Sequence, residues 1–166
     1  ALLVLENGTV IYSGSTSEFG VDSRTFIQAT APDNSLIWQH TYSFKEGGAL
    51  LRKILATGDG RMLCIGSIDD NQVPNNFIND AYAWMLMLDE NGHELWRKVW
   101  KPGNGAYVGG SLNNGHYYHD DKILLLGFRY TPSGGRQFLM ETDINGDIHW
   151  IRDFILGTNT WGDPVI

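Results

Sequence analysis

Residues 83–96 read AWMLMLDENGHELW and carry the strongest structural signal in the chain. The six residues 83–88 are all apolar, which is typical of a short inner strand covered on both faces by its neighbours. Asn91-Gly92 then predicts a hairpin, because both central residues of a type I′ turn take positive φ angles. A further strand is expected from Glu94 through Trp96 to Trp100. The stretch therefore predicts two antiparallel strands inside an all-β fold.

The same pattern occurs three times. In the third copy, strand residues 137–142 precede the turn at 143–146 and a strand at 149–151, and in the first copy residues 24–30 precede a turn at 33–34. The tryptophans that share one position are Trp38, Trp96 and Trp150, which lie 58 and 54 residues apart. The glycines predicted to end the second strand of each copy are Gly14, Gly66 and Gly127, which lie 52 and 61 residues apart. A period of roughly 50 residues with four short strands in each unit predicts a β-propeller rather than a helical repeat.

The repeat sets the expected organisation of the chain. The units are residues 1–46, 47–102 and 103–156, with 157–166 starting or completing a blade. Residues 47–55 are expected to form a first strand, because they match the corresponding parts of the other units. The prediction is an all-β chain of about three four-stranded antiparallel blades. Known propellers use roughly 4–8 blades, so either two copies pair to give six blades or the chain is part of a longer polypeptide.

Composition and charge restrict the class of protein. Of the 166 residues, 42% are hydrophobic and 12% aromatic, which excludes a disordered chain. The net charge of −7, with Lys and Arg scattered along the chain, disfavours a nucleic-acid partner, since binding to phosphates needs a basic surface. No apolar stretch approaches the roughly 20 residues of a membrane helix, so no membrane insertion is expected. The single cysteine, Cys64, excludes an internal disulfide, and its apolar neighbours predict a buried position.

A resemblance to a known family rests on the segment Gly14-Ser15-Thr16-Ser17-Glu18-Phe19-Gly20 and on residues 88–96. The pattern resembles the β-propeller repeats of secreted and cell-surface bacterial proteins, in which a Gly-Ser-Thr strand end precedes an Asp-x-Asn-Gly-x-x-x-Trp turn and strand. It is similar, more distantly, to the tryptophan-docking repeats of quinoprotein propellers. The resemblance covers essentially the whole chain, but Ala31 stands where the other copies have Asp89 and Asp143. It implies an extracellular, cell-surface or periplasmic location and a role in adhesion, scaffolding or binding.

Aromatic residues are the candidate ligand contacts. The three tryptophans of the repeat are expected to pack blade against blade, with sugar stacking as the alternative. Other aromatic residues lie outside the repeat register or in expected loops, where ligand contact is favoured. Phe77 lies three residues after Pro74 in the variable loop 69–80, which with the loops 16–23 and 130–136 is expected to form a recognition rim. The candidate ligand-binding residues are Trp100, Trp161, Phe77, Tyr117 and Tyr118.

Two patterns evoke metal binding. Asp143, Asn145 and Asp147 have the spacing that begins a calcium loop, but the twelfth position, which requires a bidentate Glu, holds Phe154. A hairpin turn explains the same residues. His116 and His119 flank Tyr117-Tyr118 in the expected loop 113–121, and no further ligand is specified, so a solvated turn is favoured. No metal and no cofactor is therefore expected.

Three hypotheses for function remain open. The first is a non-catalytic binding or scaffold module that recognises a protein or a glycan through its blade loops. The second is a propeller enzyme, glycoside hydrolase-like or quinoprotein-like, with a site formed across several blades; the chain lacks the Gly-x-Ser-x-Gly and His-Glu-x-x-His motifs. The third is a purely structural half-propeller that assembles with itself. Carboxylates in expected loops are Glu18, Asp69, Asp70, Asp80 and Asp120.

Overall fold

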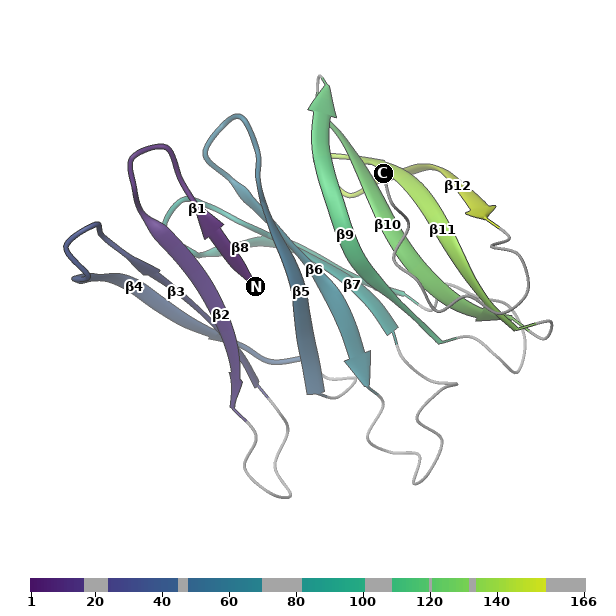
Figure 1. Ribbon diagram of the computed structural model, residues 1–166, viewed down its shortest axis with the longest axis horizontal. Helices are drawn as coiled ribbons and strands as arrows, with labels where there is room; N and C mark the ends of the chain where they lie inside the picture. Colours follow the sequence, from purple (N-terminus) through teal and green to yellow (C-terminus); the bar gives the residue numbers. More distant parts are fainter. Residues whose placement is uncertain are drawn as a thin grey trace.

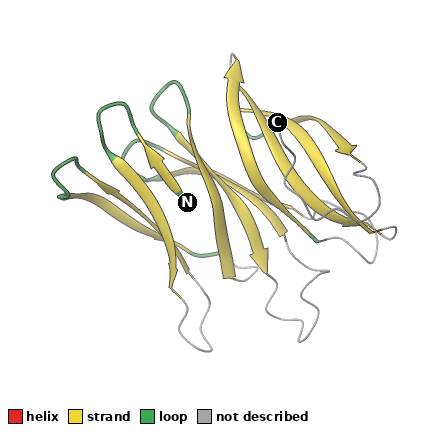
Figure 2. Cartoon of the chain, viewed as in Figure 1, coloured by secondary structure: helices red, strands yellow, loops and turns green. Residues whose placement is uncertain are grey.

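The computed structural model describes residues 1–16, 24–44, 48–69, 82–100, 109–119, 121–131 and 134–154. Within these ranges the chain forms twelve strands and no helix (Figure 2). The strands make three four-stranded antiparallel sheets, and each sheet follows the order of the chain. The prediction of an all-β chain with three four-stranded antiparallel sheets is therefore confirmed. Over the same ranges the structure offers no helix with the length and apolar character needed to cross a membrane.

The twelve strands have the following bounds. The first sheet consists of β1 (Leu2–Val4), β2 (Val10–Thr16), β3 (Arg24–Thr30) and β4 (Leu36–Tyr42). The second sheet consists of β5 (Gly48–Ala56), β6 (Met62–Asp69), β7 (Tyr82–Leu88) and β8 (Glu94–Trp100). The third sheet consists of β9 (Gly110–His119), β10 (Lys122–Thr131), β11 (Gly134–Asp143) and β12 (Ile148–Phe154). The first strand predicted at residues 47–55 is thus found as β5.

The three sheets stand side by side in chain order (Figure 1). Strand β5 contacts β1, β2 and β3 of the first sheet, and β9 contacts β5, β6 and β7 of the second. The second sheet is therefore covered on both faces. Side chains of residues 83–88 in β7 are all buried and alternate between two hydrophobic cores. The core of the first and second sheets receives Trp84, and the core of the second and third sheets receives Met85.

Each sheet sets a glycine of its second strand opposite an aromatic residue of its third. The pairs are Gly14 with Phe26, Gly66 with Trp84 and Gly127 with Phe138. A Cβ atom on these glycines would lie 2.5, 2.9 and 2.2 Å from the respective rings. The ring thus fills the space of the missing side chain, and the strand pairing continues past the glycine. The prediction that these glycines end their strands was wrong for this reason.

The turns between third and fourth strands are hairpin turns of a longer type than the sequence predicted. In the turn 89–93, the Gly92 amide donates to the Asp89 carbonyl at 3.1 Å, and the Asp89 amide donates to the His93 carbonyl at 2.9 Å. Gly92 has a φ angle of 79°, whereas Asn91 is not among the residues with positive φ. The Asp89 carboxylate closes the loop by accepting the Asn91 amide at 2.9 Å. The hairpin is therefore present, but the type I′ assignment was wrong, and the turns 31–35 and 143–147 repeat the same backbone bonds.

Cys64 lies in β6 and is fully buried, as predicted. Burial raises the pKa of its thiol, so the thiol stays protonated at neutral pH. Cys64 therefore packs as a small apolar residue in the core of the first and second sheets.

Candidate functional site

The Trp38 side chain, from β4 of the first sheet, packs against the turn 89–93 of the second sheet. Its indole N–H donates to the Glu90 carbonyl at 3.1 Å. The ring approaches Gly92 so closely that a Cβ atom there would lie 2.7 Å from it. Two more side chains of β4 bind the same turn: His40 Nε2 lies 3.0 Å from the Asn91 carbonyl oxygen, and the Tyr42 hydroxyl donates to the Gly92 carbonyl at 2.5 Å. We call this contact, an indole over the left-handed glycine of the next sheet's turn, a tryptophan seat.

Trp96 forms the second tryptophan seat, on the third sheet. A Cβ atom at Gly146 would lie 2.6 Å from its ring, and Gly146 has a φ angle of 75°. Beside the ring, Lys98 Nζ lies 2.7 Å from Asp147 Oδ1. The pairing register is the same in all three sheets: Trp38 is opposite Ala29, Trp96 opposite Met87 and Trp150 opposite Glu141, and an irregularity of register follows each pair. The repeat tryptophans thus hold one structural position.

Alanine at Gly92 is expected to destabilise the fold more than alanine at Gly60. Both glycines have positive φ, which costs a Cβ-bearing residue about 1–2 kcal/mol. A Cβ at Gly60 meets nothing within 4 Å, whereas a Cβ at Gly92 meets the ring of Trp38. Chemical denaturation of both variants should show Gly92→Ala losing at least about 1 kcal/mol more than Gly60→Ala. Equal losses would mean that the seat adds nothing to stability.

A polar cluster surrounds Glu141 on the face of the third sheet that points away from the second. Its neighbour Met140 lies in the core of the second and third sheets, and side chains alternate along a strand. The Glu141 carboxylate accepts a hydrogen bond from the Tyr118 hydroxyl and lies 3.1 Å from His149 Nδ1 and 3.6 Å from Lys122 Nζ. Its side chain is only 10% exposed. The first and second sheets have Ala29 and Met87 at this position, so the cluster belongs to the third sheet alone.

Hydrogen bonds keep Glu141 ionised. The Tyr118 hydroxyl, followed by His149, Lys122 and the Trp150 indole, lowers the pKa of Glu141 to about 2 against the opposing effect of desolvation. A general acid at neutral pH requires the opposite, a raised carboxyl pKa. The cluster is therefore suited to a fixed negative charge rather than to proton donation.

The stability of the fold should depend on pH because the Glu141 carboxylate is held in its ionised form. The folded-state pKa of Glu141 lies below its ordinary value of 4.5, so the stability from this group is present above about pH 4.5 and is lost as pH falls towards 2. The melting temperatures of the wild type and Glu141→Gln are therefore expected to differ at neutral pH and to converge between about pH 4.5 and 2. Tyr118→Phe removes the hydrogen bond that lowers the pKa of Glu141 most. In the Tyr118→Phe background, adding Glu141→Gln should therefore change the melting temperature at neutral pH less than it does in the wild type, but should still change it. A constant difference over this pH range would contradict the assignment.

Tyr117 and Tyr118 lie in a strand, not in the loop that the sequence predicted. Both belong to β9, which pairs with β10. The register shifts there, with Lys122 opposite His119 and Ile123 opposite Tyr117, so Tyr118 is an extra residue in the ladder. Tyr117 packs against the core of the second and third sheets, while Tyr118 reaches Glu141. The two predicted ligand contacts are thus separated, and the solvated-turn interpretation of His116 and His119 was wrong because β10 provides a pairing partner.

The other predicted aromatic contacts have different outcomes. Trp100 is half-buried against the core of the second and third sheets, and its indole nitrogen is buried without a hydrogen-bond partner in the structure. Phe77 and Trp161 lie outside the described residues, as do Glu18, Asp70, Asp80 and Asp120. Sequence reasoning missed Glu141, although the signal was present as a carboxylate at a repeat position that is apolar in the other two copies.

The Asp143 turn uses its carboxylates internally. Asp143 Oδ1 accepts the amides of Asn145 at 2.8 Å and Asp147 at 2.9 Å. The hydrogen bond with Lys98 lowers the pKa of Asp147. These contacts account for the Asp-x-Asn-Gly-Asp pattern as a hairpin turn that also pairs two sheets. Across the described ranges, no group of three or more His, Cys, Asp or Glu side chains is placed to hold a metal ion.

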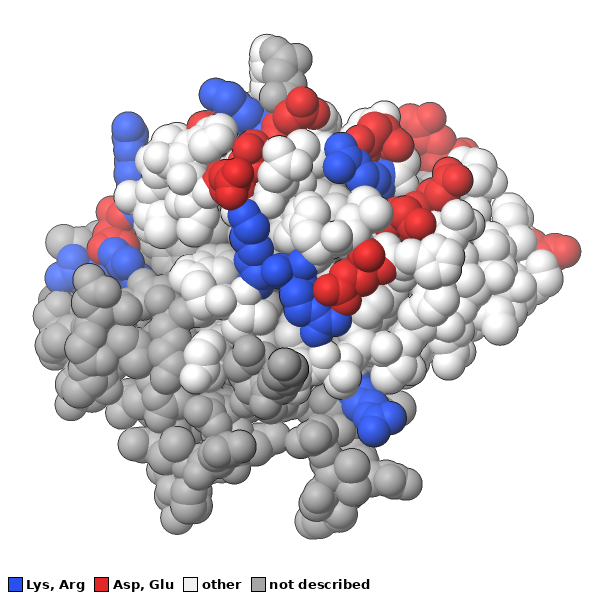
Figure 3. All heavy atoms as spheres, turned by 180° about the vertical axis from the view of Figure 1, so that it is seen from behind, with Lys and Arg blue, Asp and Glu red and all other residues white. Residues whose placement is uncertain are grey.

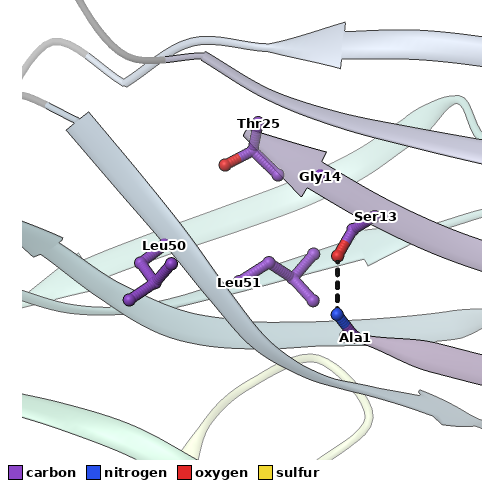
Figure 4. Close-up of a pocket in the computed structure, with 6 residues that line it drawn as sticks. All are labelled: Ala1, Ser13, Gly14, Thr25, Leu50 and Leu51. Atoms are coloured by element: carbon purple, nitrogen blue, oxygen red, sulfur yellow. Dashed lines mark hydrogen bonds between the residues drawn. The ribbon is translucent and has the colours of Figure 1, made fainter. Parts of the chain in front are cut away.

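A small cavity lies between the first and second sheets (Figure 4). Its volume is about 210 Å³, below the roughly 300–1,000 Å³ of typical ligand pockets. The two hydroxyl groups that line it already have partners: Ser13 Oγ accepts from the Ala1 ammonium at 3.0 Å, and Thr25 donates to the Ala49 carbonyl at 2.6 Å. The two hydroxyl groups of the cavity are therefore already engaged and offer little for recognising a ligand.

Charges are interspersed on the side of the molecule opposite to that of Figure 1. Basic and acidic side chains lie beside each other there (Figure 3). Among the described residues, Arg97 pairs with Glu94 and Arg129 pairs with Asp153 at 2.5 Å. These partly exposed pairs each contribute at most about 1 kcal/mol.

Comparison with protein-family models and with curated protein sequences finds no match to this chain.

Proposed function

We propose that the chain forms three successive blades of a β-propeller. The observation that carries the proposal is the tryptophan seat, which recurs in one register at both junctions between sheets. Both junctions place a tryptophan over the turn glycine of the next sheet in the same register, and a junction of this kind that is repeated with further sheets would lead around a ring. The second sheet supports the same view, because it contributes to a core on each of its faces, as propeller blades do when they pack face to face on both sides.

The proposed role is that of a non-catalytic module that binds a protein or a glycan through its loops, in an extracellular, cell-surface or periplasmic setting. The second strands β2, β6 and β10 run in the same direction, so the ends of these strands, where the next segments of the sequence begin, lie at one edge of the sheets (Figure 1). These segments differ in length and sequence between the repeats, while the sheets keep their register. A rigid frame that holds variable segments along one edge is the usual construction of a binding surface.

A glycan array and a surface-protein panel test this role directly. The purified chain is expected to bind a defined glycan or protein, and replacing residues 71–80 with a Gly-Ser segment of equal length should abolish binding. The matched control exchanges the edge-strand residue Thr41, an exposed position, for alanine and should leave binding unchanged. Far-ultraviolet circular dichroism of each variant checks that the sheets remain. Hydrolysis of glycosides by the wild-type chain would instead favour an enzyme.

A further inference from the structure

The first sheet differs from the other two at the turn position on which a tryptophan seat depends. Asn34 takes the place of Gly92 and Gly146, and all three residues have positive φ, at 67°, 79° and 75°. The turn 31–35 has the same backbone hydrogen bonds as the turn 89–93, so Asn34 Cβ occupies the position that a Cβ on Gly92 would take. At Gly92 and Gly146 that position lies 2.7 and 2.6 Å from a seated indole. An indole placed over Asn34 in the same way would overlap its side chain.

The third sheet, in contrast, presents the side chains that a seat requires. We call its face away from the second sheet, which carries Glu141, Trp150 and Arg152, the forward face. Trp150 and Arg152 stand opposite Glu141 and Leu139, in the register that Trp96 and Lys98 have with Met87 and Met85. The Arg152 cation lies 5.1 Å from the centre of the Trp150 ring, as Lys98 Nζ lies 5.7 Å from that of Trp96.

The junction between the second and third sheets shows what fits a face that presents a tryptophan and a cation. Trp96 covers a glycine at the fourth turn position, and Lys98 pairs with an acid, Asp147, at the fifth. In the first sheet these two positions hold Asn34 and Ser35, and the Ser35 hydroxyl donates to Asp33 at 2.6 Å. The first sheet therefore lacks both the space for the Trp150 indole and the acid for Arg152.

We propose that Asn34 prevents the first sheet of one copy from seating on Trp150 of another. The forward face is a docking surface for a four-stranded sheet of the same repeat whose turn carries glycine at the fourth position and an acid at the fifth, and not for a second copy of this chain. The inference rests on the proposed propeller arrangement. It adds a rule for which sheet can pack on the forward face of the third sheet. It also argues against self-assembly of two copies into a six-bladed ring.

Sedimentation equilibrium of the full chain tests the rule. Asn34→Gly combined with Ser35→Asp converts the first turn into an acceptor and is expected to tighten self-association by about tenfold or more. Asn34→Asp with Ser35→Asp is the matched control, because it keeps the Cβ atom and a residue type that tolerates positive φ. The wild type and this control should remain at the monomer mass of 18.6 kDa. Adding Trp150→Ala to the glycine variant should reverse the gain.

Two results would overturn the proposal. One is a wild-type chain that already dimerises and loses this property with Trp150→Ala, since Asn34 would then be no obstacle. The other is a glycine variant that associates no more than its aspartate control. Both differ from a failure of the tryptophan seat on which the propeller proposal rests, which would appear as equal losses of stability for Gly92→Ala, at the seat inside the chain, and Gly60→Ala, away from it.

Discussion

Trp84→Ala is expected to lower the free energy of unfolding by about 3–5 kcal/mol, a large share of the roughly 5–15 kcal/mol typical of a whole domain. The Trp84 side chain is completely buried in the core of the first and second sheets. Its ring lies 4.8 Å from the ring of Phe44, and the Arg97 guanidinium covers that ring at 4.7 Å. Removing the indole would leave a cavity with walls from two sheets, which neither sheet can fill alone.

Phenylalanine at the same position provides the matched control. The first and third sheets carry Phe26 and Phe138 opposite their glycines, so a phenyl ring fits the gap that Gly66 leaves. The exchange also removes an indole N–H that is buried without a hydrogen-bond partner. Urea denaturation followed by circular dichroism should therefore show a loss of about 1–2 kcal/mol for Trp84→Phe, smaller than the loss for alanine. Equal losses would show that the glycine–aromatic pair is not the unit of packing.

The buried strand β7 and the repeat of three sheets could be predicted from sequence because their signals are local. Residues 83–88 are uniformly apolar, and the tryptophan spacing marks the period. Strand β9 was missed in part because Asn113, His116 and His119 resemble loop residues. Its side chains are largely exposed along this segment, so polar residues are compatible with a strand as long as a neighbour provides the ladder. That neighbour, β10, could not be inferred from the composition of β9.

The Glu141 cluster shows a second limit of the sequence. The carboxylate stands out when the three repeats are aligned, but its partner Tyr118 reaches it through a register shift between β9 and β10. Such a shift depends on pairing between strands and leaves no pattern along the chain. The chemistry of the cluster, an ionised group held by several donors, therefore becomes visible only in three dimensions.

In the first turn, the departure from the repeat that is most visible in the sequence is not the one with the largest structural effect. Sequence comparison singled out Ala31 as its departure from the repeat, because the other turns begin with an aspartate. In the structure, Asp33 takes over by accepting the Ser35 hydroxyl at 2.6 Å and the Ser35 backbone amide at 3.0 Å, and these two hydrogen bonds lower the pKa of Asp33. The loss of an aspartate is thus compensated within the turn. Asn34, which sequence reasoning treated as an ordinary turn residue, is the substitution that changes what the sheet can bind.

Gly66→Ala should have the second large effect on stability, a loss of about 3 kcal/mol or more. A Cβ atom on Gly66 would lie 2.0 Å from the Leu50 carbonyl oxygen and 2.9 Å from the Trp84 ring. The first contact is with backbone of the neighbouring strand β5, so relief requires the two strands to separate. Melting curves of Gly66→Ala should therefore shift strongly, and adding Trp84→Phe should not restore stability.

Gly14 and Gly127 provide graded comparisons with Gly66, because all three glycines occupy the same repeat position but have different surroundings. A Cβ on Gly14 would meet only the outer part of the Phe26 ring, which is half-exposed and can rotate, so Gly14→Ala should lose about 1 kcal/mol. A Cβ on Gly127 would meet the Phe138 ring and, at 2.7 Å, the Ser111 carbonyl oxygen. The expected order of destabilisation is Gly66, then Gly127, then Gly14. This order follows from how closely a backbone oxygen approaches the Cβ position of each glycine. A larger loss of stability at Gly14 than at Gly66 would show that the aromatic ring, and not the neighbouring strand, makes glycine necessary.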